Sequence, residues 1–282
     1  MHPPLSPPLS LSVSVVVHDN SPELLQQVLA SLQRSAGFAA AAGYLGQAVV
    51  DVLDNSPDPD QRRRVEEALA RLPSGTGVSV RYTRLPANRG FGAGHNTVLD
   101  GMASDVHLVL NPDAVLEEDA LRAGLARLAA TPDIVLLSPR VLGATGATEY
   151  LCRRYPSVLV LLLRGFAPRA IRRLFRRRLD HYEMRDICAG EQEVDVLLAS
   201  GCFMLVRSAA LRATGGFDER YFLYFEDYDL SLRLGNHGRL VFCPAMRIVH
   251  HGGYASGKGF RHVRYFIRSA TRFFHDHGWR WI

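Results

Sequence analysis

The chain has 282 residues, 47% of them hydrophobic, and a formal net charge of +5, which is enough for one large core or two fused halves. Its four cysteines are scattered without close pairing, so neither a disulfide framework nor a zinc site is indicated, and a reducing cytosolic setting is expected. No apolar run approaches the ~20 residues of a membrane span, and a signal-peptide pattern is absent. We therefore expect a soluble α/β protein that does not cross a bilayer, with residues 1–11 as a flexible, proline-rich N-terminus.

The first half of the chain alternates buried strands with helices or glycine-rich loops. An amphipathic helix is expected from Pro22 and a charged one over Asp60–Leu72. Strands are predicted at Leu11–Val17, Ala48–Leu53, Val78–Tyr82 and Val106–Leu110. Each strand ends in polar residues, the pattern of an open doubly wound sheet, in which ligands bind at the carboxyl ends of the strands.

A glycine-rich loop follows the third strand and reads Asn88-Arg89-Gly90-Phe91-Gly92-Ala93-Gly94-His95-Asn96. A dinucleotide fingerprint follows the first strand and is less tightly spaced, so NAD or FAD binding is disfavoured. A glycine-rich turn that opens a helix still lets backbone N–H groups approach an anion closely. The loop therefore suits a phosphate group.

Two further strand ends carry groups that can bind a metal. Asn111-Pro112-Asp113 follows the fourth strand, and one carboxylate there can hold Mg²⁺ or Mn²⁺, although an ordinary turn is the alternative. Short strands at Leu240–Phe242 and Arg247–Val249, separated by Pro244, lead to His250 and His251. An imidazole at this place can serve a metal or a phosphate, and a structural role is the alternative.

An acidic stretch follows the predicted strand Glu193–Leu198 and the apolar run Phe203–Val206. Its Gly-Gly turn and aromatic run lead to Glu226, Asp227 and Asp229, and the apolar residues after them have helical spacing. A carboxylate at a helix start, flanked by rings that exclude water, can act as a general base. The alternative is that these acids only cap the helix. Between the two halves, a helix over Glu117–Ala129 and a strand over Ile134–Ser138 are expected.

Two segments combine basic with apolar or aromatic residues. Seven arginines lie between residues 164 and 178, interleaved with leucine, isoleucine and phenylalanine. This pattern suits a helix on an anionic membrane surface, and a solvated basic face or a nucleic-acid patch are the alternatives. The tail from His262 to Ile282 predicts a second amphipathic helix with an aromatic and basic face, for which docking against the core is the alternative.

Taken in order, these motifs resemble the inverting family-two nucleotide-sugar glycosyltransferases, particularly their bacterial rhamnosyltransferase-like branch. The resemblance runs from about Ser12 to Gly257 and rests on the ends of the strands, the glycine-rich loop, the Leu-Asn-Pro-Asp motif, the acidic stretch and the Val-His-His motif. It implies the GT-A fold, with a Rossmann-like, mostly parallel sheet flanked by helices. A nucleotide-sugar-binding half (12–115) would be fused to an acceptor half (116–257), followed by the C-terminal aromatic and basic helix (258–282).

The resemblance also implies roles for individual residues. Asp227 would be the general base, with Glu226 beside it. Asp113 would bind the metal together with His250 or His251. The nucleotide-sugar site would be formed by His18, Asn20, Asp54, Asn88, Arg89, Gly90, Asn111 and Gly201.

Two positions depart from the family pattern. Asn111 replaces the first acid of the family's Asp-x-Asp motif, a substitution that recurs in the rhamnosyltransferase-like branch. His18 and Asp19 replace the usual residues before Asn20, so the contacts of the base pocket differ.

The implied activity is the transfer of L-rhamnose from dTDP-rhamnose to a hydroxyl of a lipid-linked or polysaccharide acceptor, in cell-surface glycan synthesis. A divalent ion, Mg²⁺ or Mn²⁺, would sit on the diphosphate. The expected place is the cytoplasmic face of the membrane, with peripheral membrane contact and no nucleic-acid partner. A nucleotidyltransferase and a non-catalytic carbohydrate- or nucleotide-binding protein are the alternatives. The sequence leaves the oligomeric state open.

Overall fold

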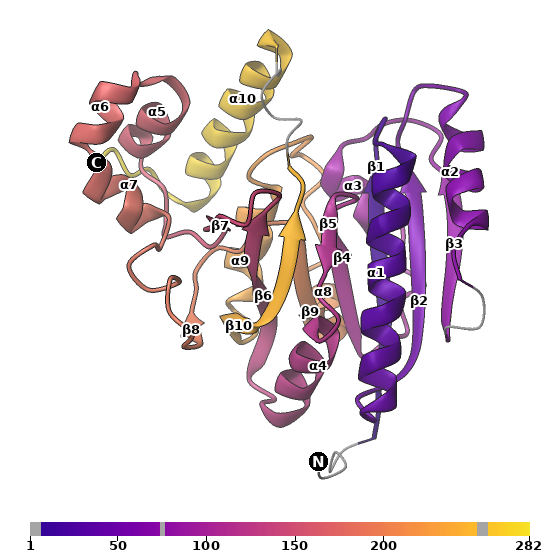
Figure 1. The fold of residues 1–282 in the computed structure, drawn as a ribbon. Helices are drawn as coiled ribbons and strands as arrows, with labels where there is room; N and C mark the ends of the chain where they lie inside the picture. Colours follow the sequence, from indigo (N-terminus) through magenta and orange to yellow (C-terminus); the bar gives the residue numbers. More distant parts are fainter. Residues whose placement is uncertain (1–6, 74–76, 253–258) are drawn as a thin grey trace.

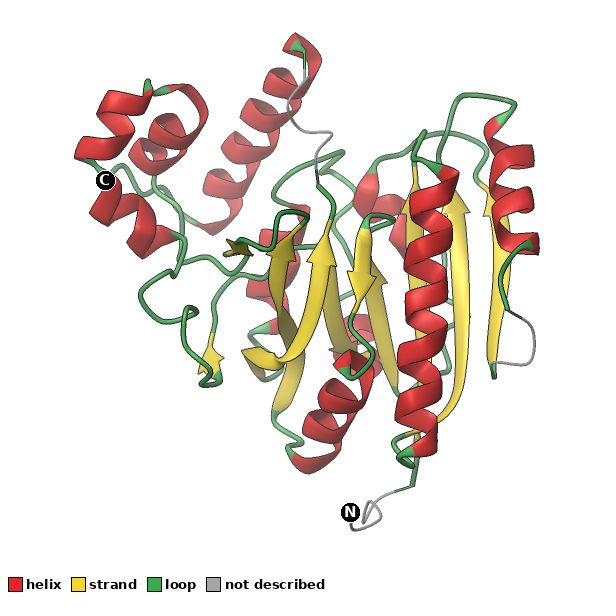
Figure 2. Ribbon diagram, in the orientation of Figure 1, coloured by secondary structure: helices red, strands yellow, loops and turns green. Residues whose placement is uncertain are grey.

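The computed structural model describes residues 7–73, 77–252 and 259–282. Within them, one ten-stranded sheet has the order β3-β2-β1-β4-β9-β6-β10-β5, with β7 paired to β6 and β8 paired to β10. Helices cover both faces of this sheet, and a separate group of helices lies beside it (Figures 1 and 2). The expected α/β architecture is confirmed.

The first half of the sheet is parallel, as the sequence predicts. It consists of β1 (Leu9–Val17), β2 (Leu45–Asp54), β3 (Val78–Arg84) and β4 (Val106–Leu110). Strand β1 lies between β2 and β4, and its Val13 is in register with a residue of each. The carboxyl ends of these strands therefore meet at one edge of the sheet.

Strand β1 begins at Leu9, so residues 9–11 belong to the sheet and not to a flexible N-terminus. Leu9 is in register with Leu45, and the Ser10 hydroxyl donates to Asp105 Oδ2 over 2.6 Å. The first residues of β1 are therefore tied to β2 and to Asp105, the residue before β4. This part of the predicted boundary is wrong.

The second half of the sheet is mixed. Strand β9 (Phe203–Arg207) runs antiparallel to both β4 and β6 (Ile134–Gly143), whereas β10 (Arg239–His250) is parallel to β6. The short β5 (Ala114–Leu116) pairs antiparallel with the end of β10. The junction of β4 and β9 therefore marks the boundary between the parallel half and the rest.

Three strand assignments in this half differ from the prediction. The two strands separated by Pro244 are one strand, β10, because a register shift between Cys243 and Arg247 accommodates the proline, which has no N–H to donate. The strand expected over Glu193–Leu198 is reduced to β8 (Val194–Asp195). Strand β7 (Thr148–Glu149) is not indicated by the sequence, since two residues carry no periodicity.

Two cores fill the space between the sheet and its helices. On one face lie α1 (Pro22–Ala41), α2 (Gln61–Ala70) and α4 (Ala120–Ala130); α1 and α4 are in contact with each other (Figure 1). The other core contains residues of α8 (Ser208–Ala213) and α9 (Glu226–Leu234), with α3 (Phe91–Asn96) packed beside it. Helix α1 begins where its sequence predicts, since the Ser21 hydroxyl caps it and Pro22 occupies its first turn.

The basic segment forms three short helices instead of one. These are α5 (Val158–Phe166), α6 (Arg169–Leu174) and α7 (Arg176–Tyr182). Pro168 stands immediately before α6, and a proline disfavours helix at the residue before it, so the helix of α5 ends there. The prediction of a single amphipathic helix is wrong at this point.

The C-terminal helix α10 (Phe260–His277) packs on α9 and α5 beside the sheet (Figure 1). It ends at Gly278, whose φ of 105° is a left-handed conformation that favours glycine. Phe273 and Phe274 are buried in a third cluster with Leu161, Tyr221 and Phe225. None of the helices in the described ranges is long and apolar enough to span a bilayer.

Candidate active site

A cavity of about 390 Å³ lies at the carboxyl ends of β1 and β4; we call it the strand-end cavity. The structure brings six of the predicted nucleotide-sugar and metal residues together in its wall: His18, Asn20, Asn88, Gly90, Asn111 and Asp113. Arg261, His262 and Tyr265 of α10 also line it. The wall of this cavity therefore combines residues from the first half of the chain with residues of the C-terminal helix.

Gly90 gives the glycine-rich loop its close approach to the rest of the site. Its φ is 101°, and a Cβ atom there would lie 2.2 Å from the carbonyl oxygen of Phe222. The Asn88 side chain accepts a hydrogen bond from the Gly90 N–H at 2.9 Å, and the Asn55 side chain donates to the Gly90 carbonyl at 3.0 Å. Only glycine fits both this conformation and this spacing.

Asp113, His250 and Glu149 form a charged group at the end of β10. His250 Nε2 lies 3.3 Å from Asp113 Oδ1, and its Nδ1 lies 3.0 Å from Glu149 Oε2. Burial lowers the pKa of His250, but its bonds to Asp113 and Glu149 outweigh that effect and raise the pKa to about 8. His251 is joined to Asp113 through the backbone, its N–H donating to the Asp113 carbonyl at 2.8 Å.

These residues fit a divalent metal in one respect. Asp113 Oδ1 is buried and lies 3.3 Å from His250 Nε2, so these two groups would be the protein ligands of a cation bound here. Described residues contain no group of three or more histidine, cysteine or acidic side chains placed to hold a metal. A hard ion at Asp113 and His250 would therefore take most of its ligands from water and a bound diphosphate.

Asp54 and Arg89 are among the predicted residues that do not line the strand-end cavity. Asp54 is fully buried, and its carboxylate accepts hydrogen bonds from the Ser56 N–H at 2.8 Å and the Tyr82 hydroxyl at 2.7 Å. Arg89 is exposed and pairs with Glu219. A direct contact of either residue with a nucleotide stays a prediction.

Helix α9 starts with Glu226 and Asp227 directly after two residues with unusual backbone. Tyr224 and Phe225 have φ values of 70° and 66°, a left-handed conformation that is costly for bulky side chains. Such residues persist where the surrounding structure fixes them, and Phe225 is held by rings of Phe266 and Phe273, each 5.3 Å away between centroids. The sharp turn places both acids at the exposed N–H end of the helix.

The two acids have different surroundings. Asp227 Oδ2 accepts from the Gly201 N–H at 3.0 Å, and its Oδ1 accepts from the Tyr228 N–H at 2.9 Å. Burial raises the pKa of Asp227, and these backbone bonds oppose that rise. Glu226 Oε2 is buried and has no hydrogen-bond partner among the described residues. Burial and the neighbouring Asp227 charge raise the pKa of Glu226 well above its usual range, which favours its neutral form.

Asp229, the third acid of the stretch, has a structural role. Its carboxylate pairs with Arg233 at 2.6 Å and with His277 Nε2 at 2.8 Å, which joins α9 to α10. Gly201, expected among the nucleotide-sugar residues, donates its N–H to Asp227, and a contact of Gly201 with the nucleotide sugar stays a prediction.

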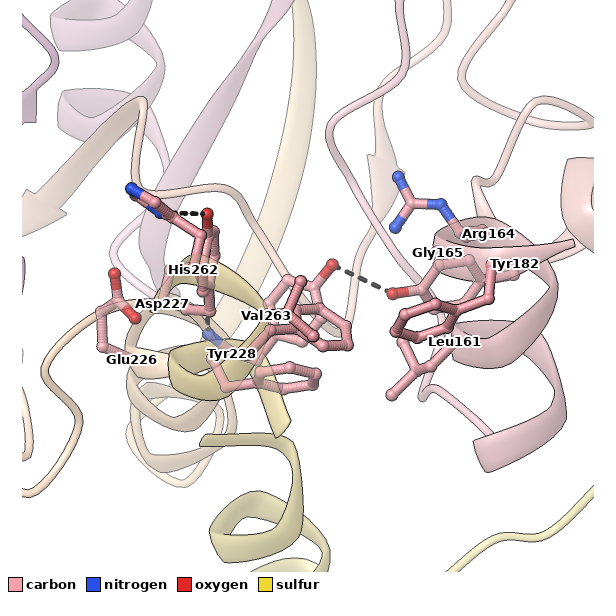
Figure 3. A pocket seen from close by; sticks show the side chains of 13 residues that line it. Leu161, Arg164, Gly165, Tyr182, Glu226, Asp227, Tyr228, His262 and Val263 are labelled. Carbon is pink, nitrogen blue, oxygen red and sulfur yellow. Dashed lines mark hydrogen bonds between the residues drawn. The ribbon is translucent and has the colours of Figure 1, made fainter. Parts of the chain in front are cut away.

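A second cavity, of about 510 Å³, opens beside Asp227; we call it the aromatic cavity. Figure 3 shows Glu226, Asp227 and Tyr228 on one side, and Arg164 and Tyr182 on the other. The hydroxyls of Tyr182 and Tyr228 lie 3.0 Å apart and link α7 to α9. His262 lines both this cavity and the strand-end cavity, so the two are neighbours at the start of α10.

The sequence did not indicate several of these residues. Glu149 lies 101 positions from His250, and its two-residue strand gives no pattern to recognise. Arg261, His262 and Tyr265 belong to a helix for which the sequence allows either a membrane-facing surface or docking against the core. The repeated aromatics of that tail were the available signal, but they do not indicate which way the helix faces.

The sequence model described as glycosyltransferase-like family 2 matches residues 8–269. The chain belongs to this family. An N-acetylglucosaminyl-diphospho-decaprenol L-rhamnosyltransferase of Mycobacterium tuberculosis is 31% identical over 207 residues, which cover 68% of this chain and 64% of that protein. The rhamnosyltransferase WbbL of Escherichia coli is 38% identical over 76 residues, covering 26% of this chain and 29% of that protein. The chain thus spans less than two thirds of these curated relatives, which support the rhamnosyltransferase-like branch of family 2.

Solved structures confirm the GT-A type of fold for this family-2 chain. GalNAc-T7 with UDP, GalNAc and Mn²⁺ has a TM-score of 0.60 at 15% identity, covering 86% of this chain and 43% of that one. A mannosyltransferase of Pyrobaculum calidifontis with GDP-Man and Mn²⁺ has a TM-score of 0.58 at 16% identity, covering 95% and 62%.

Proposed function

We propose that this family-2 chain is an inverting glycosyltransferase that moves L-rhamnose from dTDP-rhamnose to a hydroxyl of a lipid-linked or polysaccharide acceptor. The observation that carries the proposal is the place of Asp227. Its carboxylate lies in the wall of the aromatic cavity, and that cavity adjoins the strand-end cavity at His262. Donor and acceptor bound in the two cavities would meet beside one carboxylate.

Asp227 acts as the general base in this proposal. It takes the proton of the acceptor hydroxyl as that oxygen attacks the anomeric carbon, and the nucleoside diphosphate leaves from the opposite face, with inversion. The Gly201 and Tyr228 N–H groups hold the carboxylate in place and favour its ionised form. Burial raises the pKa of Glu226 beside it, which disfavours a second negative charge next to Asp227.

The strand-end cavity is the proposed donor site. Asp113 and His250 would hold Mg²⁺ or Mn²⁺, an ion that neutralises charge on the diphosphate when it is bound. The loop at Asn88 and Gly90 lies in the same wall and would approach the phosphates or ribose with its backbone. Two structurally similar enzymes were solved with Mn²⁺, which supports a divalent ion here.

The names of the relatives support the choice of substrates. The mycobacterial relative is named for an acceptor linked to decaprenol by a diphosphate. We extend this to the present chain as a lipid-linked acceptor used in cell-surface glycan synthesis, at the cytoplasmic face of the membrane.

The variant Asp227→Asn tests the general base. Asparagine has nearly the same shape but cannot take a proton, so rhamnosyl transfer should fall by ~10²–10⁴-fold. Binding of dTDP, measured by calorimetry, should be unchanged because Asp227 lies outside the strand-end cavity. Asp229→Asn is the control for a lost charge on the same helix, and it should affect stability more than turnover. Near-normal turnover of Asp227→Asn would falsify the role of this residue.

Thermal stability with dTDP, UDP and GDP, each with and without Mn²⁺, tests the donor. A ligand at 100 times its Kd adds ~2.7 kcal/mol of stability to the folded state. We expect a metal-dependent rise with dTDP. A rise with UDP alone would mean that the donor carries uridine diphosphate and not dTDP. No rise with any of the three nucleotides would favour a non-catalytic binding protein.

A further inference from the structure

A pocket lined by arginines lies on the helices α5 to α7, outside the two cavities described above. Its volume is about 470 Å³; we call it the arginine pocket. The arginines in its wall are Arg164, Arg169, Arg172, Arg173, Arg176 and Arg185.

The positive charge of this pocket is only partly balanced by protein groups. Its two acids, Asp180 and Glu183, pair with Arg176, Arg164 and Arg185 at distances of 3.2, 3.2 and 2.7 Å. The other three arginines, all on α6, have no carboxylate partner in the parts of the chain that the structure describes: Arg169, Arg172 and Arg173. Guanidinium groups gathered without carboxylates suit an anion with several oxygens, above all a phosphate.

The arginine pocket is continuous with the aromatic cavity. Arg164 lines both, and its guanidinium carbon lies 5.5 Å from the centre of the Tyr182 ring. Tyr182 faces the aromatic cavity, while the next residue, Glu183, lines the arginine pocket. In Figure 3 Arg164 lies across the aromatic cavity from Asp227. An acceptor that reaches Asp227 can therefore extend past Arg164 into the arginine pocket.

We propose that the arginine pocket binds the diphosphate of a lipid-linked acceptor, with the acceptor sugar in the aromatic cavity. This inference rests on the proposed function. A diphosphate on the anomeric carbon of the acceptor sugar is one ring away from the hydroxyl that Asp227 deprotonates, which matches two adjoining cavities. On α6, Ile171 and Leu174 are exposed beside the arginines, 44% and 81%, so a hydrocarbon chain leaving the diphosphate meets apolar surface.

Two double variants test the proposal directly. Arg172→Gln/Arg173→Gln removes two charges from the arginine pocket. Arg177→Gln/Arg178→Gln removes two charges from exposed positions of α7 that do not line it. Calorimetry with inorganic pyrophosphate and with geranyl diphosphate, in EDTA, should show binding weakened about tenfold by the first variant and unchanged by the second. This measurement needs no transfer reaction, so it decides the arginine pocket even if the proposed function fails.

A kinetic comparison links the pocket to the acceptor. Two acceptors are compared, a diphosphate-linked saccharide and the same saccharide on a neutral alkyl chain. In Arg172→Gln/Arg173→Gln, kcat/KM for the first acceptor relative to the second should fall about tenfold, mainly through KM. The ratio should stay constant in the Arg177→Gln/Arg178→Gln control. An unchanged ratio in both variants would overturn the assignment to the acceptor.

Sedimentation with vesicles of phosphatidylglycerol and phosphatidylcholine separates this site from a general membrane contact. If both double variants lose pyrophosphate binding equally, the effect is one of net charge and the proposal is wrong. If Arg172→Gln/Arg173→Gln loses vesicle binding while its affinity for the two diphosphates is unchanged, the pocket is a bilayer contact and the proposal is also wrong.

Discussion

Phe273 holds the C-terminal helix against α9, so its removal should loosen both cavities. Its side chain is fully buried, and the ring centroid lies 5.3 Å from that of Phe225, the residue directly before Glu226. Replacing such a ring by alanine leaves a cavity and typically costs ~3–5 kcal/mol. For a chain of this size, that loss lowers the melting temperature by on the order of 10 °C. Phe273→Ala should show this fall in thermal denaturation.

The matched control is Phe260→Ala on the same helix, because Phe260 is 86% exposed. We expect its effect to stay within about 0.5 kcal/mol. Amide hydrogen exchange should also quicken throughout α10 in Phe273→Ala, since this helix loses its buried anchor. Equal stability and equal exchange of the two variants would refute the view that Phe273 anchors α10.

Three further predictions concern single side chains. Gly90→Ala should weaken dTDP binding by tenfold or more while the protein stays folded, because its Cβ would clash with the Phe222 carbonyl; unchanged affinity contradicts this. Glu226→Gln should raise the melting temperature at pH 8 but not at pH 4. Because the pKa of Glu226 is raised in the folded state, the unfolded chain loses this proton more readily above pH ~4.3, and this loss favours unfolding. Glutamine has no proton to lose, so the variant escapes this cost. A pH-independent difference would disprove this. Ellman's reagent should find almost no reactive thiol in the native protein and four in denaturant, because all four cysteines are buried; rapid labelling of the native protein would contradict the packing.

The parallel half of the fold was predictable because its signals are local. Apolar runs such as Val106–Leu110 are bounded by polar turns, and Ser21 and Pro22 indicate where α1 begins. Strand β10 was predicted as two strands, because the bulge at Pro244 depends on pairing with β6 and not on its own sequence. Likewise, a proline between basic helices divided a segment whose amphipathic pattern looked continuous.

The candidate site was predictable as a set of strand ends, but its closure was not. The proximity of Asn20, Gly90 and Asp113 could be predicted, because the carboxyl ends of parallel strands meet at one edge of the sheet. Glu149 and His262 reach the site through tertiary packing between segments that lie far apart in the chain, and no periodicity records such contacts. Asp54 shows the opposite case, a polar residue at a strand end whose bonds are all internal.

The way in which Asp227 is held has a consequence for how such a protein can diverge. Both of its oxygens accept hydrogen bonds from main-chain N–H groups, of Gly201 and Tyr228, so no polar side chain is needed to hold them. The facing wall, with Arg164 and Tyr182, is made of side chains, whose identity a substitution changes. Descendants of one ancestral gene can therefore acquire new acceptors by changing that wall, while the position of the carboxylate is inherited unaltered.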